Sequence, residues 1–173
     1  MITIGFIISN EMFRDEEYLE PKKVLDNAGI KTITIAKQKT LCTGKLGATV
    51  NPDLSLENVN TLDFDGIVFI GGVGCKTYWH DETAHKICKD IIQQNKVLAA
   101  ICSSVATLAF AGVLNGKKAN SYQAERDTLK ENGAILTLDD ITIDRKIITA
   151  TGPKVSRGFG EAILKNLRQN YVN

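Results

Sequence analysis

The stretch "VLAAICSSVATLAFAGVL" (97–114) places a cysteine between a short apolar run and a helix-like segment of small and apolar residues. The run before the cysteine is typical of a strand that is covered on both faces of a sheet. Where a strand turns into a helix within about two residues, only small side chains fit two positions before and after the turn. Ala100 and Ser104 occupy these positions around Cys102. The stretch therefore predicts a nucleophile elbow.

The rest of the chain alternates between strand-like and helix-like segments. Strands are expected at 2–8, 30–36, 64–72, 96–101, 134–138 and 141–151, a hairpin region at 41–59, and helices at 16–29, 81–95, 103–112, 124–133 and 156–170. Such alternation predicts a mostly parallel sheet with helices on both faces. We expect α/β class, with residues 1–173 forming a single flavodoxin-like, doubly wound domain.

Composition narrows the classes of partner. The 173 residues contain 21 Lys and Arg and 20 Asp and Glu, so no overall charge favours nucleic acid or an anionic membrane. The chain opens without a basic segment before its first apolar run, and no apolar run approaches 18 residues. We expect a cytoplasmic protein without a nucleic-acid or membrane partner, and a substrate that is small or captured locally.

The cysteines and histidines do not follow a metal-binding or disulfide pattern. They are Cys42, Cys75, Cys88, Cys102, His80 and His85, with no Cys-x-x-Cys spacing. We expect free thiols and no metal. Cys42 and Cys88 are interpreted as structural, and Cys75 either as a turn residue or as a second exposed thiol.

Two interpretations of Cys102 remain open from its local sequence. At the start of a helix, the dipole and unpaired amides would stabilise a thiolate and lower the thiol pKa. Alternatively, Cys102 is one more buried thiol, since cysteine is among the most buried residue types.

Other strand ends offer further candidates. Gly71 and Gly72 form either an ordinary turn or a backbone that donates amides to an oxyanion. The acidic residues of "FRDEEYLEP" (13–21) either complement a helix start or supply one buried, protonated carboxyl group near the thiol. The two histidines are interpreted as solvated or capping residues, with Asp81 as a helix cap.

Taken together, these segments resemble the ThiJ/PfpI (DJ-one) superfamily almost end to end. The residues that carry the resemblance are "FRDEEYLEP", "TGKLGATVNPDLSL", "FDGIVFIGG", "AAICSSVATLAFAGVLNGKKANSY" and "TATGPKVSRGFGEAIL". The resemblance implies that Cys102 is the reactive nucleophile and that Glu17, four residues before Pro21, is the carboxyl group bonded to it. It also implies oxyanion donors at the amides of Gly72 and Ser103, a homodimer, and no metal or organic cofactor.

The sequence departs from the family at its histidines. The protease-like branch has a histidine directly after the elbow cysteine, where this chain has Ser103. The position that matches the histidine of the deglycase-like branch is Tyr122, and a phenol with a pKa of about 10 is a poor base at neutral pH. Glu17 is then the only obvious proton carrier.

Three functions follow from the resemblance. The first is a cofactor-free glyoxalase- or deglycase-like enzyme that acts on a small carbonyl substrate or on glycated groups. The second is a non-catalytic redox-sensing or chaperone-like protein that uses oxidation of Cys102. A cysteine peptidase ranks last, because no histidine stands at either familiar position. The loops around 11–15, 74–80 and 151–157 would shape the pocket, and Met12, Phe13, Tyr78 and Trp79 would either wall it or pack in a core or dimer contact.

Overall fold

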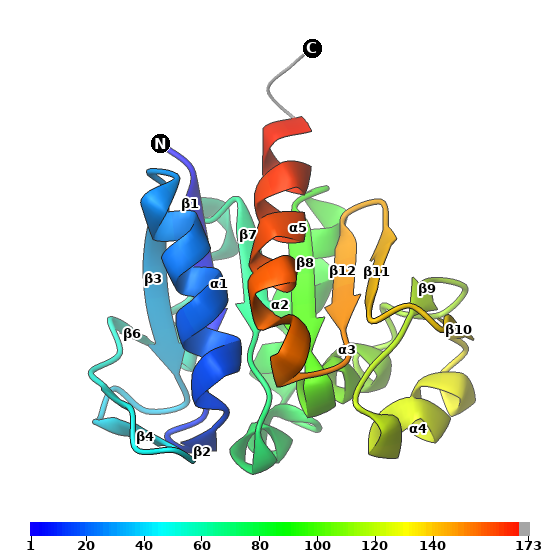
Figure 1. The fold of residues 1–173 in the computed structure, drawn as a ribbon, viewed down its shortest axis with the longest axis horizontal. Helices are drawn as coiled ribbons and strands as arrows, with labels where there is room; N and C mark the ends of the chain where they lie inside the picture. Colours follow the sequence, from blue (N-terminus) through cyan, green and yellow to red (C-terminus); the bar gives the residue numbers. More distant parts are fainter. Residues whose placement is uncertain (170–173) are drawn as a thin grey trace.

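A seven-stranded sheet with helices on both faces forms the centre of the protein, as seen in a computed structural model that describes residues 1–169 (Figure 1). The strands are β1 (Thr3–Ile7), β2 (Glu11–Phe13), β3 (Lys31–Ala36), β4 (Cys42–Gly44), β5 (Thr49–Val50), β6 (Leu54–Ser55), β7 (Gly66–Phe69), β8 (Val97–Ile101), β9 (Lys118–Ala119), β10 (Ile135–Leu136), β11 (Ile141–Asp144) and β12 (Ile147–Ala150). The helices are α1 (Asp15–Asn27), α2 (Glu82–Gln93), α3 (Val105–Phe110), α4 (Arg126–Glu131) and α5 (Ser156–Gln169). The sheet order is β11-β12-β8-β7-β1-β3-β6, and every neighbouring pair is parallel except β11 and β12. The predicted flavodoxin-like α/β fold is confirmed.

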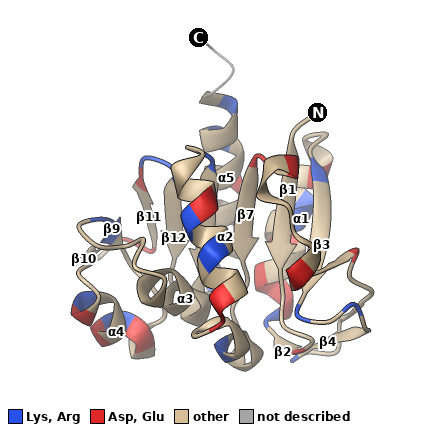
Figure 2. Cartoon of the chain, turned by 180° about the vertical axis from the view of Figure 1, so that it is seen from behind, with Lys and Arg blue, Asp and Glu red and all other residues tan. Residues whose placement is uncertain are grey.

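Each face of the sheet has its own hydrophobic core. Helices α1 and α5 cover one face and α2 and α3 the other (Figures 1 and 2). Along β8, Leu98 and Ala100 belong to the core under α2 and α3, whereas Ala99 and Ile101 belong to the core under α1 and α5. Because successive side chains of a strand point to opposite faces, a strand buried on both faces consists of a continuous apolar run. This explains why β8 was recognisable from sequence.

Helices α1 and α5 approach each other closely through a glycine. A Cβ atom at Gly160 would lie 2.7 Å from the Cα atom of Pro21, which is too close for any larger residue without movement. Helix α1 continues through Pro21 to Asn27, and Gly29 follows its end with a φ of 77°. This packing fixes α1, whose first turn carries the acidic residues considered below.

Two predicted strands differ from the structure. The segment 141–151 is not one strand but an antiparallel hairpin of β11 and β12, which turns at Arg145 with a φ of 56°. Hairpin turns with positive φ usually contain Gly, Asn or Asp, so an arginine at the turn concealed it. Of 134–138, only β10 is a strand, and it pairs with β9 outside the main sheet.

The remaining predicted elements agree with the structure in type. Asp81 caps α2 by accepting a hydrogen bond from the Ala84 amide at 2.9 Å. The 41–59 region holds the antiparallel pair β4 and β5, although β6 joins the main sheet. The last predicted helix ends at Gln169 in the structure, and position 170 lies outside the described residues.

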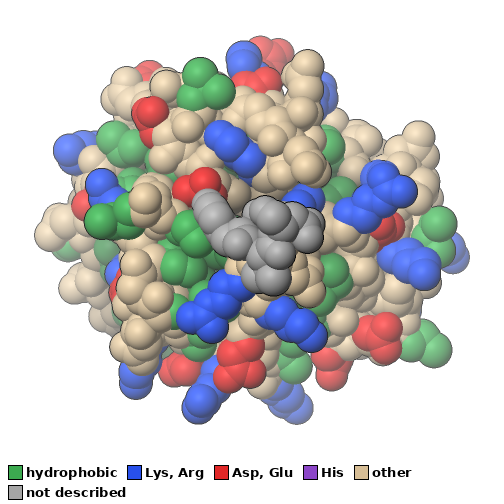
Figure 3. Space-filling model, turned by 90° about the horizontal axis from the view of Figure 1, so that it is seen from above, with side chains coloured by type: hydrophobic (Ala, Val, Ile, Leu, Met, Phe, Trp, Pro, Cys, Tyr) green, Lys and Arg blue, Asp and Glu red, His purple; other side chains and the backbone are tan. Residues whose placement is uncertain are grey.

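The ends of the molecule differ in character. The end that carries the chain termini shows basic and acidic side chains interspersed over its surface (Figure 3). At the opposite end lie the carboxyl ends of the parallel strands (Figure 1). Within residues 1–169, no helix is both long enough and apolar enough to cross a membrane.

Candidate active site

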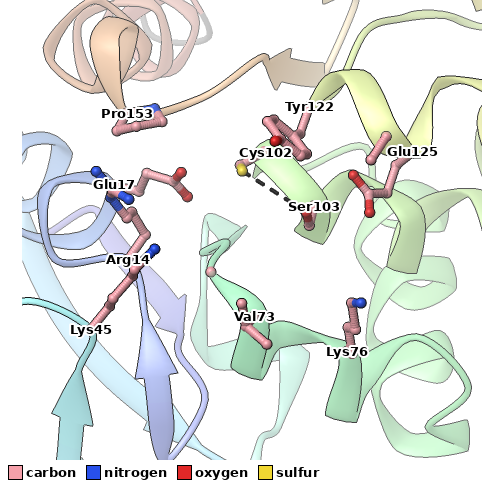
Figure 4. A pocket seen from close by; sticks show the side chains of 12 residues that line it. Arg14, Glu17, Lys45, Val73, Lys76, Cys102, Ser103, Tyr122, Glu125 and Pro153 are labelled. Carbon is pink, nitrogen blue, oxygen red and sulfur yellow. Dashed lines mark hydrogen bonds between the residues drawn. The ribbon is translucent and has the colours of Figure 1, made fainter.

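A pocket of about 350 Å³ opens beyond the carboxyl ends of the central strands β1, β7 and β8 (Figure 4). Ligands of open α/β sheets bind at this edge. Its lining residues are Arg14, Glu17, Lys45, Gly72, Val73, Lys76, Cys102, Ser103, Tyr122, Ala124, Glu125 and Pro153. The three loops expected to shape the pocket each contribute, through Arg14, Lys76 and Pro153. The structure thus brings together all four predicted site residues: Cys102, Glu17, Gly72 and Ser103.

Cys102 occupies the sharp turn that the sequence predicted. It directly follows β8, its φ is 63°, and the next residues begin the short helical segment that leads into α3. A non-glycine residue in the left-handed region costs about 1–3 kcal/mol, and such residues cluster at functional sites. The geometry of a nucleophile elbow is therefore present, with Cys102 partly buried and lining the pocket.

Four hydrogen bonds hold this turn against its strain. The Ser104 hydroxyl lies 2.8 Å from the Phe69 carbonyl oxygen and accepts from the Ile101 amide at 3.1 Å, which ties the elbow to β7 and β8. The Tyr122 amide donates to the Cys102 carbonyl at 3.3 Å. The Trp79 indole N–H donates to the Ser103 carbonyl at 3.0 Å. The small side chain at 104 thus anchors the turn as well as leaving room for it.

The glycine pair brings backbone close to the reactive groups. A Cβ atom at Gly71 would lie 2.4 Å from Oε2 of Glu17 and 2.7 Å from Cβ of Cys102. At Gly72, where φ is 100°, a Cβ atom would lie 2.4 Å from the Met12 carbonyl oxygen. Neither position accepts a side chain without displacement. Gly72 lines the pocket as expected, and Gly71 has a role that the sequence did not single out.

The acidic residues at the start of α1 serve different purposes. The Asp15 carboxylate accepts the amides of Leu46 and Ala48 at 2.9 and 2.8 Å, which fastens the loop after β4. Glu16 pairs with Arg14 at 2.9 Å, and Glu20 is exposed.

Glu17 is the acidic residue that turns inward, as the family resemblance implied. Its side chain is fully buried, and its carboxyl group points toward Cys102 (Figure 4). Oε2 accepts the Gly71 amide at 3.0 Å, whereas Oε1 has no hydrogen-bond partner among the described residues. Burial raises the pKa of Glu17 to about 7, against the smaller opposing effects of the Cys102 thiol and the Gly71 amide. Near neutral pH, Glu17 is therefore poised to accept or donate a proton.

The thiol pKa differs from the expectation based on the helix dipole. Burial, followed by the charge of Glu17, raises the pKa of Cys102 to about 12, although the Ser103 amide lowers it. Desolvation outweighs the donors at the helix start, because a buried thiolate loses more water than these groups replace. Sγ lies 4.0 Å from the Ser103 hydroxyl oxygen. At neutral pH the Cys102 thiol therefore keeps its proton, and any reaction of the thiol requires a nearby base.

None of the remaining cysteines and neither histidine is among the residues that line the pocket. Cys42, Cys75 and Cys88 are buried, so the alternative that Cys75 is an exposed thiol is wrong. His80 stacks on Phe110 with ring centroids 4.3 Å apart, and His85 Nε2 lies 2.6 Å from the Trp79 carbonyl oxygen. Neither histidine is among the twelve lining residues.

Tyr122 and Glu125 lie on the pocket wall opposite Glu17 (Figure 4). Tyr122 is half exposed, and its amide rather than its side chain supports the elbow. Glu125 is buried, so the pocket holds a second buried carboxyl group besides Glu17, which the sequence analysis did not single out. The sequence concealed Glu125, because an acidic residue before a helix is normally interpreted as solvated.

Other expected wall residues and metal ligands can be placed as well. Phe13 and Tyr78 are buried in the cores, and neither Met12 nor Trp79 is among the lining residues. Within residues 1–169, no group of three or more His, Cys, Asp or Glu side chains is arranged to hold a metal ion.

Comparisons with known proteins agree with this geometry. The DJ-1/PfpI family model matches residues 3–166. A protein of Methanocaldococcus jannaschii is 37% identical over 167 residues, which cover 95% of this chain and 82% of the relative. Deglycase PfpI of Pyrococcus furiosus is 31% identical over 150 residues, covering 87% of this chain and 90% of the relative. The crystal structure of a ThiJ/PfpI domain protein from Brachyspira murdochii has a TM-score of 0.94 and 32% identity, with 96% of both chains covered.

Replacing Glu17 tests its buried environment. Because burial raises the folded-state pKa from 4.5 to about 7, the folded protein retains a proton that the unfolded chain releases. Wild-type stability should therefore fall as pH rises from 4.5 to 7. Gln has no carboxyl group to ionise, so Glu17→Gln should not lose stability in this way. Above pH 7, the free energy of unfolding of Glu17→Gln should exceed that of the wild type by up to about 3 kcal/mol.

Urea unfolding across this pH range measures the difference. Glu20→Gln is the matched control, because it removes an exposed carboxylate from the same helix. Parallel stability curves for wild type and Glu17→Gln would contradict the assigned pKa.

Proposed function

The chain belongs to the DJ-1/PfpI family, and from this premise we propose that it is a cysteine-dependent enzyme that acts on small reactive carbonyls or glycated groups. The observation that supports the proposal is that Cys102, whose backbone lies in the left-handed region, stands beside the buried carboxyl group of Glu17. Several relatives about 30% identical to this chain are named deglycases, which supports the same chemistry. A pocket of about 350 Å³ suits a small substrate.

In the first step, the Cys102 sulfur attacks the carbonyl carbon. The S–H proton passes to Glu17, which has an unpartnered oxygen and a pKa of about 7 and is therefore suited to act as general base. The carbonyl oxygen gains the negative charge, and the amides of Gly72 and Ser103 stabilise it. Return of the proton from Glu17 to this oxygen gives a neutral hemithioacetal.

For an oxoaldehyde such as methylglyoxal, the next step moves a proton between adjacent carbons. The carbon bound to sulfur loses its hydrogen as a proton, and the neighbouring carbonyl carbon receives one, which leaves a thioester on Cys102. Water then cleaves the C–S bond and releases lactate and the free thiol. The sum is methylglyoxal plus water giving lactate, so no external oxidant or cofactor is consumed. With a glycated amine of the aminocarbinol type, the sulfur attacks the carbonyl next to the carbinol carbon. The C–N bond of the carbinol carbon then breaks, its hydroxyl proton passes to the nitrogen, and the amine leaves while that carbon becomes an aldehyde.

The absence of a histidine among the lining residues shapes this proposal. Loss of one positioned acid–base group costs about 10²-fold or more in rate, so turnover should be slow. A Cys–His peptidase mechanism has no support among the twelve lining residues.

A redox function is the second candidate. Cys102 is the only cysteine that is not fully buried among those described, which would direct oxidation to it. However, the raised pKa keeps the resting thiol protonated at neutral pH, and peroxide reacts with the thiolate. The carbonyl enzyme therefore ranks first.

We also propose that the protein is a cytoplasmic homodimer, as the family resemblance implies. Met12, Leu46 and Val73 are exposed apolar residues on the segments that surround the pocket, with 42%, 62% and 61% of their surface accessible. Sedimentation velocity should report twice the chain mass of 18.9 kDa. A species of single chain mass at every concentration would contradict the dimer.

Lactate formation from methylglyoxal tests the enzyme directly. Wild type should turn over, and Cys102→Ala and Glu17→Gln should each lose at least about 10²-fold, because one lacks the nucleophile and the other the base. Wild-type activity should rise with pH through about 7, as Glu17 ionises. Glu20→Gln should match the wild type.

Turnover that survives in Cys102→Ala would overturn the assigned nucleophile. If the wild type forms no lactate, methylglyoxal is not a substrate, and mass spectrometry of peroxide-treated Cys102 becomes the test of the redox function.

A further inference from the structure

Glu125 is a buried carboxyl group in the pocket that the proposed reaction leaves without a role. Only 6% of its surface is exposed, and it lines the pocket opposite Glu17 (Figure 4). Its Oε2 atom is buried and has no hydrogen-bond partner among residues 1–169. A buried carboxyl oxygen without a hydrogen-bond partner is costly to the folded protein.

The usual structural reasons for burying a carboxylate do not apply here. Glu125 precedes α4, but its side chain makes no capping hydrogen bond. It forms no ion pair with any described residue. Lys76 lines the same pocket, yet its Nζ lies over the Trp79 ring, 5.2 Å from the ring centroid. Arg126, the next residue, uses Nη2 to donate to the Thr137 carbonyl at 3.4 Å.

We propose that Glu125 is a substrate-binding residue that accepts a hydrogen bond from an N–H or O–H group next to the carbonyl attacked by Cys102. The proposal rests on the proposed function for the identity of the reacting atom, and it deepens that function by naming a substrate class. The preferred class is carbonyl compounds with a neighbouring donor. An aminocarbinol formed from an amine and an oxoaldehyde has such donors, whereas the unhydrated oxoaldehyde has none.

Glu17 and Glu125 have different roles in this arrangement. Glu17 lies beside the sulfur and serves the reacting bond, as argued above. Glu125 lies on the far wall, beyond Cys102 and Ser103 (Figure 4), and lines the same pocket. Because a buried acceptor left unpaired disfavours a ligand that lacks the donor, the site discriminates between the two kinds of carbonyl compound.

Alkylation of Cys102 by two matched reagents tests this without any turnover. Iodoacetamide carries N–H donors on its carbonyl group, and N,N-dimethyl-iodoacetamide carries none but has the same reacting carbon. The rate at Cys102 is measured by peptide mass spectrometry and divided by the rate with glutathione. The proteins are wild type, Glu125→Leu, Glu125→Gln and Glu131→Leu, an exposed position on the same helix.

Wild type should prefer the donor reagent about tenfold after this correction. Glu125→Leu should lose the preference. Glu125→Gln keeps a neutral acceptor, so its preference should be reduced. Glu131→Leu should match the wild type. Glu125→Leu should also unfold at or above the wild-type temperature, because it removes a buried carboxyl oxygen that has no hydrogen-bond partner among residues 1–169. If Glu125→Leu does not fold, the reduced preference of Glu125→Gln still decides the question.

Two results would overturn the proposal. One is a wild-type preference no greater than that of glutathione. The other is a preference that persists in Glu125→Leu, or one that is undiminished in Glu125→Gln if that is the only folded variant. The two proposals can fail separately. If the protein forms no lactate from methylglyoxal but shows a donor preference that depends on Glu125, methylglyoxal is not a substrate, and the binding role of Glu125 still stands.

Discussion

The left-handed backbone of Cys102 is the constraint on which the rest of the site depends. A cysteine at a φ of 63° is unfavourable in isolation, so the surroundings must hold it there. The Ser104 hydroxyl ties the turn to two central strands, and the Tyr122 amide holds the Cys102 carbonyl. Both sides of the elbow are thereby fixed to segments that also line the pocket. The fold supplies the rigidity, and the elbow places the partly buried Cys102 at the pocket.

Buried carboxyl groups at the same end of the sheet are a second feature that is unfavourable for stability. The Glu17 carboxyl group occupies the space that a side chain at Gly71 would fill. Its pKa rises to about 7 because burial removes its hydration. Glu125 adds another buried acid on the facing wall. Glu17 lowers the stability of the folded protein while ionised, and in exchange it has a pKa that a solvated carboxylate would not have. The site is less stable for these groups, but Glu17 provides a base of suitable pKa and Glu125 an acceptor for a ligand.

Sequence was sufficient for the parts of the site that follow strand ends. The small residues around Cys102 and the apolar run of β8 identified the elbow, and the spacing of Glu17 from Pro21, through the family resemblance, selected one acid among several. Features set by tertiary contacts were hidden. Nothing local distinguishes the buried Glu125 from a solvated residue before a helix, and an arginine at position 145 conceals a hairpin. The direction of the Cys102 pKa depends on desolvation, which a local pattern does not report.

The central claim is that Glu17 and Cys102 act as one proton-sharing unit. It is tested most directly by the pH dependence of Cys102 alkylation in wild type and Glu17→Gln. The account predicts that the wild-type rate rises through about pH 7, as Glu17 becomes able to take the thiol proton. In Glu17→Gln the rise should move well above pH 7, because burial alone still raises the thiol pKa. The same midpoint in both proteins would contradict the account.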